Sequence, residues 1–349
     1  MGSRKRIVID NEVPFVEGVF EPFAEVEYVP SDKITREVVK DADGMIIRSR
    51  TQCDASLLEG SAVKFIATDT IITSHIDLDY CSGHGIGVKN AAGCNAGGVM
   101  NYVFSALYGV ASRQTINLDG DTIGIIGYGH VGSLVAQMAR YLGFKVLICD
   151  PPLASVMNSG DFCSLDYLLK NSDIVTLHPT VDNETRKMAD EDFFNKMKDG
   201  AMFINTSNGE LVDEDALKKA IPRLGPVIID TWGHEPNVDK ELVDMVDIAT
   251  AHIAGYSYQG KQNGTAICVR ALARFFEYPQ LYGFFPKTEI QELESIKLDL
   301  RGKTQGEIAA VIQYNYPIFT DDFIFRLDPG KFVELRSNYK YRREFYVEY

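Results

Sequence analysis

Three glycines form a G-x-G-x-x-G pattern directly after a β-branched run. The motif is Gly127-Tyr128-Gly129-His130-Val131-Gly132, and the run before it is Thr122–Ile126. Gly127 would allow a tight turn, Gly129 would let the backbone approach a pyrophosphate, and Gly132 would let a following helix pack close to the strand. The N-terminus of that helix would present unpaired N–H groups and a positive dipole end to the phosphates. The motif therefore predicts a dinucleotide-binding site, which includes His130 and Val131, rather than a purely structural turn.

An acidic residue stands at the position where a dinucleotide-binding site distinguishes NAD from NADP. The next apolar run, Lys145–Cys149, ends at Asp150, 18 residues after Gly132. The carboxylate can accept hydrogen bonds from a ribose 2′-hydroxyl and would repel a 2′-phosphate. The following Pro151-Pro152-Leu153 offers no arginine for a phosphate. The predicted cofactor is therefore NAD rather than NADP.

Further stretches, together with the glycine motif, carry a family resemblance. They are Ala92-Gly93-Cys94-Asn95-Ala96, His178-Pro179-Thr180, Ile204–Asp213, Asp230–Pro236 and His252-Ile253-Ala254-Gly255-Tyr256. From about Ile7 to the C-terminus the chain resembles the D-isomer-specific 2-hydroxyacid dehydrogenases. The Ala-Gly-Cys-Asn stretch, the turn after Cys149 and the closing segments Leu335–Tyr339 and Arg342–Glu344 are similar to the branch of that family that oxidises 4-phosphoerythronate. The resemblance implies NAD-dependent conversion of 4-phospho-D-erythronate to 2-oxo-3-hydroxy-4-phosphobutanoate, a step of pyridoxal 5′-phosphate biosynthesis.

Oxidation of a 2-hydroxy acid needs a base that takes the hydroxyl proton as hydride leaves for the nicotinamide. Imidazole suits this task because its unperturbed pKa lies near neutrality, and a neighbouring carboxylate orients it. The resemblance implies that His252 is this base and Glu235 its partner. His252 also ends a predicted strand, where open α/β sheets place their ligand sites. The alternatives are a structural histidine and a solvated acid.

More residues are implied to line the cofactor site. His178 and Pro179 follow the predicted strand Asp173–Leu177 on the nicotinamide side, with packing as the alternative for His178. Asp230 resembles the acid that contacts the nicotinamide amide, with a helix or turn cap as the alternative. Thr206 is expected to contact the cofactor through its backbone, and Gly255 belongs to the same site by resemblance.

The substrate side combines family-like residues with departures from the family. Arg48 and Ser49, at the end of a predicted strand, are candidates for binding the substrate phosphate, and Thr70 and Tyr256 complete the substrate set by resemblance. Asn208 stands at the catalytic position where the family carries an arginine that grips the substrate carboxylate and polarises the reacting carbonyl. An amide offers only neutral hydrogen bonds, which are about half as strong as charge-assisted ones.

Three other substrate-side positions also depart from the family. Ile72 stands where a small residue or glycine is usual, and its β-branched side chain restricts the backbone. Ser74 replaces an aspartate and Asn101 replaces a glutamate. Three hypotheses follow: an active 4-phosphoerythronate dehydrogenase, a dehydrogenase for another 2-hydroxy acid, and a non-catalytic NAD-binding homologue. The retained His252 and Glu235 argue against the third, whereas Asn208 and Ile72 argue for it.

The elements that must position these residues alternate between strand-length apolar runs and helical segments. One series of predicted strands is Arg6–Asp10, Met45–Arg48 and Val63–Ile66; the second is Thr122–Ile126, Lys145–Cys149, Asp173–Leu177, Ala201–Asn205, Val227–Asp230 and Ile248–Ala251. Continuous β-branched runs of this kind indicate buried parallel strands in βαβ units. A long helix is expected at Val99–Ala111, where the two series separate.

The predicted fold is α/β, with two doubly wound Rossmann-like domains and a small α+β C-terminal domain. The substrate domain takes residues 1–97 and 257–284, the NAD domain residues 98–256, and the C-terminal domain residues 285–349. The last segment is rich in aromatic residues, which usually need burial against the body or another subunit. The resemblance implies that this segment makes a homodimer.

Composition excludes several classes of partner. The chain has 349 residues and a net charge of −14, which disfavours binding to nucleic acid or an anionic membrane surface. No apolar run approaches the ~20 residues of a membrane span. The N-terminal stretch Met1–Arg6 has no apolar region behind it, so we expect no secretory signal and a cytoplasmic location. The six cysteines form no CxxC pair, so we expect reduced thiols and no metal site.

Overall fold

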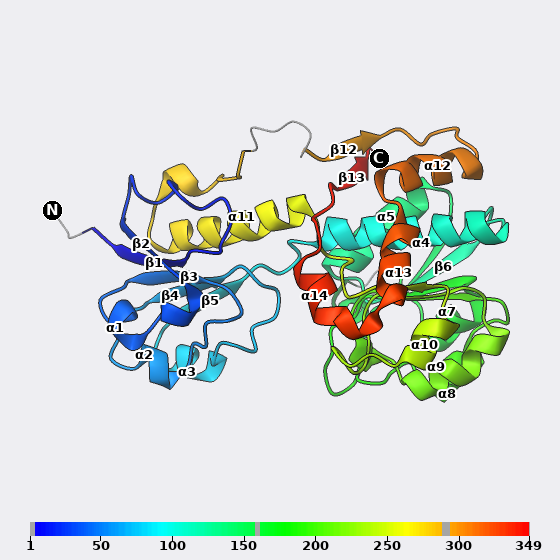
Figure 1. Ribbon diagram of the computed structural model, residues 1–349, viewed down its shortest axis with the longest axis horizontal. Helices are drawn as coiled ribbons and strands as arrows, with labels where there is room; N and C mark the ends of the chain where they lie inside the picture. The colour runs from blue at the N-terminus through cyan, green and yellow to red at the C-terminus, as the bar shows by residue number, and fades with distance from the viewer. Residues whose placement is uncertain (1–3, 158–160, 288–293, 349) are drawn as a thin grey trace. The chain divides into compact units, whose positions relative to one another are not determined.

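The computed structural model describes residues 4–157, 161–287 and 294–348 (Figure 1). Met1–Ser3, part of the N-terminal stretch considered above, lie outside the described residues. The chain forms two compact units. Unit 1 comprises Met1–Asn95 and Tyr258–Glu294, and unit 2 comprises Ala96–Ser257 and Ser295–Tyr349.

Unit 1 contains a five-stranded parallel sheet in the order β2-β1-β3-β4-β5. Its strands are β1 (Arg6–Asp10), β2 (Glu25–Val29), β3 (Gly44–Ile47), β4 (Phe65–Thr68) and β5 (Gly87–Asn90). One face packs on α1 (Arg36–Val39), α2 (Ala55–Leu58) and α3 (Leu78–Gly83), and the other on α11 (Tyr258–Phe275) (Figure 1). The described part of this unit also contains the short 3-10 helices η1 (Ser31–Lys33) and η4 (Pro279–Leu281). Strands β2 and β5 were not predicted, because these edge strands carry polar residues and form no continuous apolar run.

Unit 2 contains a six-stranded parallel sheet in the order β11-β10-β9-β8-β6-β7. Its strands are β6 (Thr122–Ile126), β7 (Lys145–Cys149), β8 (Ile174–Leu177), β9 (Met202–Asn205), β10 (Val227–Ile229) and β11 (Ile248–Ala249). All six lie within the predicted runs. The chain order reverses between β6 and β8, the switch point at which doubly wound sheets bind their ligands.

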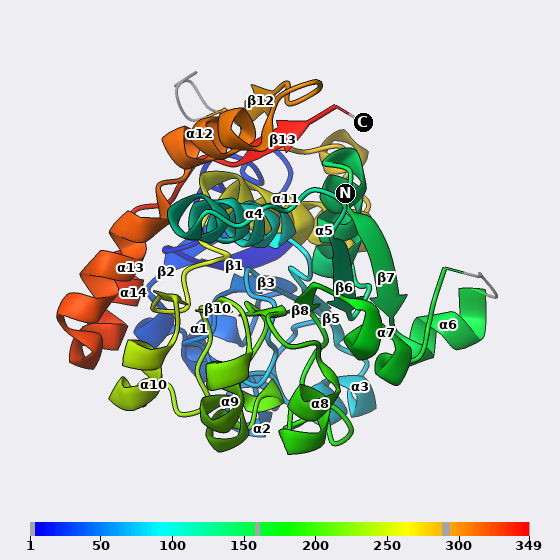
Figure 2. The same cartoon turned by 90° about the vertical axis from the view of Figure 1, so that its right-hand side faces the viewer.

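Helices cover both faces of this second sheet (Figure 2). On one face lie α4 (Ala96–Gln114), which contains the predicted helix, and α5 (His130–Tyr141). On the other lie α7 (Leu165–Asn171), α8 (Glu191–Lys196), α9 (Glu214–Ala220) and α10 (Lys240–Met245). The remaining elements are α6 (Pro151–Met157), η2 (Gly209–Leu211) and η3 (Ile221–Arg223). The α/β prediction of two Rossmann-like domains is confirmed.

The C-terminal segment packs into unit 2. It consists of β12 (Ile296–Leu298), α12 (Gln305–Asn315), α13 (Ile318–Leu327), η6 (Pro329–Lys331), α14 (Phe332–Ser337) and β13 (Phe345–Val347), with β12 and β13 parallel. Ile312 and Phe345 join the apolar core under α4 and α5, and Phe325 joins the core under α10. Much of the aromatic content of this segment is therefore buried within its own subunit. Over the described residues, no helix has both the length and the apolar character that crossing a membrane would need.

Candidate active site

The glycine loop after β6 has the geometry that its three glycines predict. Gly127 has a φ of +86°, in the left-handed region that favours glycine. A β-carbon at Gly132 would stand 1.9 Å from the carbonyl oxygen of Gly127, so only glycine lets α5 approach β6 this closely. A β-carbon at Gly129, the residue before α5, would meet no described atom within 4 Å. The glycine loop is therefore closely packed at Gly127 and Gly132 and unobstructed at the start of α5, where His130 is also exposed.

Asp150 links this loop to the next βα junction. One carboxylate oxygen accepts a hydrogen bond from the N–H of Tyr128 at 2.7 Å, and the other accepts one from the N–H of Leu153 at 3.0 Å. The side chain therefore caps the first turn of α6 and holds the glycine loop. Each oxygen still has a lone pair with which a ribose hydroxyl can bond.

His252 and Glu235 form a hydrogen-bonded pair in the segments that follow β11 and β10. Nδ1 of His252 lies 2.8 Å and 3.1 Å from the two carboxylate oxygens of Glu235. The N–H of Trp232 donates to the same carboxylate at 3.0 Å, which fixes it. Both side chains are partly exposed. Because Nδ1 is engaged, Nε2 is the ring nitrogen left to exchange a proton with a substrate.

A buried carboxylate holds the turn that carries His252. The backbone of His252 has a φ of 56°, an uncommon conformation for a residue with a side chain. Asp230 is 0% exposed and accepts hydrogen bonds from the N–H groups of Ile253 and Ala254 at 2.8 and 2.9 Å and from the Thr250 hydroxyl at 2.6 Å. Burial raises the pKa of Asp230, and these donors only reduce that rise. The geometry gives Asp230 the turn-capping role that the sequence left open as the alternative.

Three polar side-chain atoms lie buried at the ends of β8, β9 and β10. They are Nδ1 of His178, Oγ1 of Thr206 and Oγ1 of Thr231, and none finds a hydrogen-bond partner in the part of the chain that the structure describes. Buried polar groups are normally paired, so this row is suited to a ligand that has polar groups of its own, such as a nicotinamide amide. Thr231 was not predicted, although a polar residue directly after a buried strand is the signal that identified Thr206.

The ring of His178 is neutral. Burial lowers the pKa of His178 to about 3, and its Nε2 lies 3.0 Å from the hydroxyl of Thr176. The adjacent Pro179 packs on the glycine loop, because a β-carbon at Gly127 would stand 2.5 Å from the nitrogen of Pro179. These two residues therefore border the glycine loop from the neighbouring strand.

Asn208 has a local structural task. Its side-chain oxygen accepts a hydrogen bond from the N–H of Glu210 at 2.8 Å and caps η2, while its carbonyl accepts one from the Asn205 amide at 2.9 Å. The next residue, Gly209, lies against the backbone of Trp232, where a β-carbon would stand 1.9 Å from a carbonyl carbon. The amide thus stabilises a tight loop that an arginine at this position would leave without a cap.

Unit 1 contains three of the four substrate candidates. Arg48 donates to Glu12 at 2.8 Å, and Ser49 is exposed beside it. The hydroxyl of Thr70 lies 2.8 Å from that of Thr68 and donates to the carbonyl of Ile72 at 2.9 Å. Ile72 itself is 66% exposed, so its side chain occupies no internal cavity of unit 1.

The fourth substrate candidate, Tyr256, lies in unit 2 with the C-terminal segment. Its ring centroid is 6.1 Å from that of Tyr339 and 5.7 Å from that of Tyr341, and the guanidinium of Arg336 lies 5.9 Å from it. Tyr256 therefore borders residues that lie 80 to 85 positions later in the chain.

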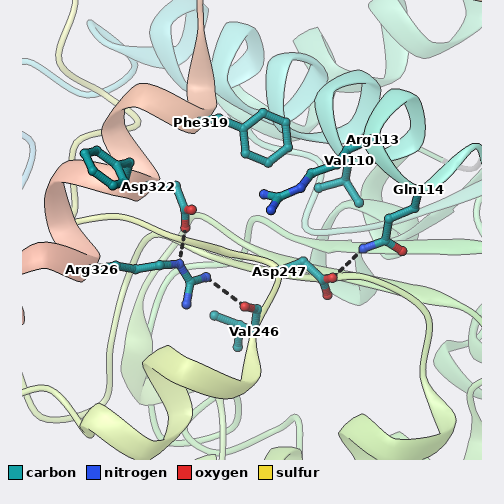
Figure 3. Close-up of a pocket in the computed structure, with 9 residues that line it drawn as sticks. Val110, Arg113, Gln114, Val246, Asp247, Phe319, Asp322 and Arg326 are labelled. Atoms are coloured by element: carbon teal, nitrogen blue, oxygen red, sulfur yellow. Dashed lines mark hydrogen bonds and ion pairs between the residues drawn. The ribbon is translucent and has the colours of Figure 1, made fainter.

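A cavity of about 570 Å³ lies elsewhere in unit 2, between α4, α13 and the two residues before β11 (Figure 3). Its lining includes Arg113, Asp247 and Phe319. Asp322 and Arg326, which both line it from α13, form a salt bridge at 2.8 Å. None of the predicted catalytic, cofactor or substrate residues lines it.

The comparisons with known proteins agree with this geometry. Residues 8–117 match the family model for the catalytic domain of the D-isomer specific 2-hydroxyacid dehydrogenases, and residues 107–254 match the model for their NAD binding domain. A protein of Bacteroides fragilis named erythronate-4-phosphate dehydrogenase is 41% identical over 346 residues, covering 97% of each chain. A protein of Cronobacter sakazakii with the same name is 38% identical, covering 97% of this chain and 92% of its own.

Solved structures share the fold. The NAD-bound 3-phosphoglycerate dehydrogenase of Entamoeba histolytica has a TM-score of 0.62 at 24% identity, covering 79% of this chain and 97% of its own. An NAD-complexed D-isomer specific 2-hydroxyacid dehydrogenase of Lactobacillus delbrueckii has a TM-score of 0.65 at 22% identity, covering 78% and 98%.

Proposed function

This chain belongs to the D-isomer-specific 2-hydroxyacid dehydrogenase family and is an NAD-dependent enzyme, and from that premise we propose that its substrate is 4-phospho-D-erythronate. The product is 2-oxo-3-hydroxy-4-phosphobutanoate, and the step serves pyridoxal 5′-phosphate biosynthesis. The observation that carries the proposal is the similarity to proteins named erythronate-4-phosphate dehydrogenase along 97% of the chain. The His252–Glu235 pair supplies the acid–base chemistry that this oxidation needs.

In the proposed mechanism, His252 takes the proton of the substrate 2-hydroxyl at Nε2. Glu235 holds Nδ1 and stabilises the positive charge that develops on the ring, and Asp230 holds the turn that aims it. NAD, when bound, supplies the acceptor for the hydride that leaves carbon 2 of the substrate.

The residues present suit NAD. The open N-terminus of α5 would hold the pyrophosphate, and Asp150 the adenine ribose. The unpartnered atoms at the ends of β8 to β10 would meet the nicotinamide. The cofactor-binding residues that we propose are Gly127, Gly129, His130, Val131, Gly132, Asp150, His178, Pro179, Thr206, Asp230 and Gly255; Asp230 would act through the turn that it caps.

On the substrate side, Arg48 and Ser49 would bind the phosphate. Thr70 and Tyr256 would contact the rest of the substrate. Asn208 would approach the carboxylate with a neutral amide. That last feature favours a second candidate function, the oxidation of another 2-hydroxy acid, because an amide grips a carboxylate less strongly than a guanidinium does.

A homodimer built by the C-terminal segment is also part of the proposal. Leu327 of α13 is 68% exposed, and Tyr314 and Phe323 nearby in the sequence are exposed as well. Apolar side chains gathered on one segment are typical of an interface. The domain boundaries at residues 97, 257 and 285 and the cytoplasmic location stay predictions.

Turnover tests the substrate assignment. NADH formation should be faster with 4-phospho-D-erythronate than with unphosphorylated 2-hydroxy acids. Faster turnover of another 2-hydroxy acid would select the second candidate. NAD binding without turnover of any 2-hydroxy acid would support the third hypothesis, a non-catalytic NAD-binding homologue.

A further inference from the structure

A buried acidic residue adjoins the proposed phosphate site of unit 1. β3 and β4 are paired with Ile47 beside Thr68, and the N–H of Asp69 donates to the carbonyl of Ile47 at 2.9 Å. Arg48 and Asp69 are therefore the next residues on two neighbouring strands. By alternation they lie on the same face as Ile46 and Ala67, which is the face that α11 covers.

Asp69 lies directly against α11. Its Oδ1 occupies the space above Gly264, where a β-carbon would stand 2.0 Å from it. Lys261 lies three residues earlier and thus on the same side of the helix. Asp69 is only 8% exposed, and its Oδ2 finds no hydrogen-bond partner within residues 4–157, 161–287 and 294–348. The Nε of Arg48 is likewise buried and unpartnered within those ranges.

The charges around Asp69 compete. Burial raises the pKa of Asp69 to about 6, the positive charges of Lys261 and Arg48 lower it, and Asp10 at the end of β1 raises it. A further titratable neighbour is Cys268 of α11, a thiol whose pKa burial raises well above its usual value. Asp69 thus keeps its charge near neutral pH because two cations lie close to it. An anion that bound beside Lys261 and Arg48 would reduce their effect and so raise the pKa of Asp69.

We propose that Arg48 and Lys261 together bind the phosphate group of the substrate, with Asp69 as their buried counter-charge. Lys261 is then a further phosphate-binding residue. Asp69 opposes the phosphate while it is ionised and takes up a proton from solvent when the phosphate binds. This inference rests on the proposed function for the identity of the substrate, whereas the anion site itself does not depend on the reaction.

Calorimetry of the full chain tests the site with inorganic phosphate and with 4-phosphoerythronate. Lys261→Gln should weaken the binding of both by roughly tenfold, because one charge-assisted contact is lost. The exposed Lys40→Gln in the same unit is the matched control and should change neither affinity. In turnover, Lys261→Gln should raise KM with little change in kcat.

Asp69→Asn separates the proton-linked role from a merely structural one. At pH 8 the variant should bind phosphate about tenfold more tightly than the parent, because a buried negative charge is removed. Repeating the titration at pH 7 in buffers of different ionisation enthalpy should show proton uptake by the parent that is absent from the variant. Equal proton uptake in both proteins, or an unchanged phosphate affinity in Lys261→Gln, would overturn the proposal.

The outcomes also separate this inference from the proposed function. Phosphate binding that depends on Lys261, without turnover of 4-phosphoerythronate, would keep the anion site and refute the substrate assignment. Turnover of 4-phosphoerythronate that is unchanged in Lys261→Gln and in Asp69→Asn would keep the substrate assignment and refute the anion site.

Discussion

Asn208 is the position at which a single substitution tests the substrate side most directly. Asn208→Arg would place a guanidinium on the loop that lies against the backbone of Trp232, from which its planar donors could hold the substrate carboxylate and reach the reacting oxygen. We expect kcat/KM for 4-phosphoerythronate to rise about tenfold or more, which corresponds to roughly 1.4 kcal/mol of transition-state stabilisation. Most of the gain should appear in kcat, because the charge on the reacting oxygen changes during the chemical step.

The structure also indicates that Asn208→Arg should lower the stability of the protein. Asn208 accepts the N–H of Glu210 at 2.8 Å, and an arginine cannot accept a hydrogen bond. Loss of such a cap costs about 1 kcal/mol of stability. Asn208→Ala loses the cap without adding charge and is therefore the matched control: both variants should unfold at a similarly lowered Tm, and only the arginine variant should gain activity.

Initial rates of NADH formation, measured for the parent and both variants, decide the outcome. A gain confined to Asn208→Arg combined with Ile72→Gly would show that the loop around Ile72 also restricts the site. If neither the single nor the double variant exceeds the parent, Asn208 does not limit activity, and the site serves a different ligand or a different binding mode.

Three further predictions concern the rest of the proposed machinery. Glu235→Gln should lower kcat by about 10²-fold or more while NAD binding persists, and an unchanged kcat would remove the partner of His252 from the mechanism. NAD should bind much more tightly than NADP by calorimetry at fixed salt, and Asp150→Ala should narrow that difference; equal affinities in the parent would contradict the ribose assignment. Leu327→Asp should convert a dimer to a monomer in light scattering without changing the fold. Deletion of residues 286–349 is a poorer test, because Ile312 and Phe345 belong to the core of unit 2 and their loss would disturb the fold. A parent that is already monomeric would refute the homodimer.

Most of the sheet of unit 2 could be predicted from the sequence. The central strands β6, β8 and β9 are buried on both faces, so each appears in the sequence as a continuous apolar run. The three glycines of the loop after β6 were equally predictable, since only glycine adopts the φ of Gly127 and tolerates the contact at Gly132. The edge strands of unit 1, β2 and β5, were missed for the complementary reason. The β2 sequence Glu25–Val29 alternates polar and apolar residues on a half-exposed surface, and β5 has no apolar run.

The sequence alone therefore determined the fold class and the glycine loop, because these depend on local pattern, and its family motifs predicted the pair His252 and Glu235. Only the tertiary structure showed which polar groups are paired. Asp230 is bonded to N–H groups more than twenty residues away, and Arg48 is paired with Glu12 across 36 positions. Asp69 lies against Gly264, a residue of α11 that comes nearly two hundred positions later in the chain. Hydrogen bonds and charge pairs of this kind form between elements that folding brings together, so no local spacing encodes them.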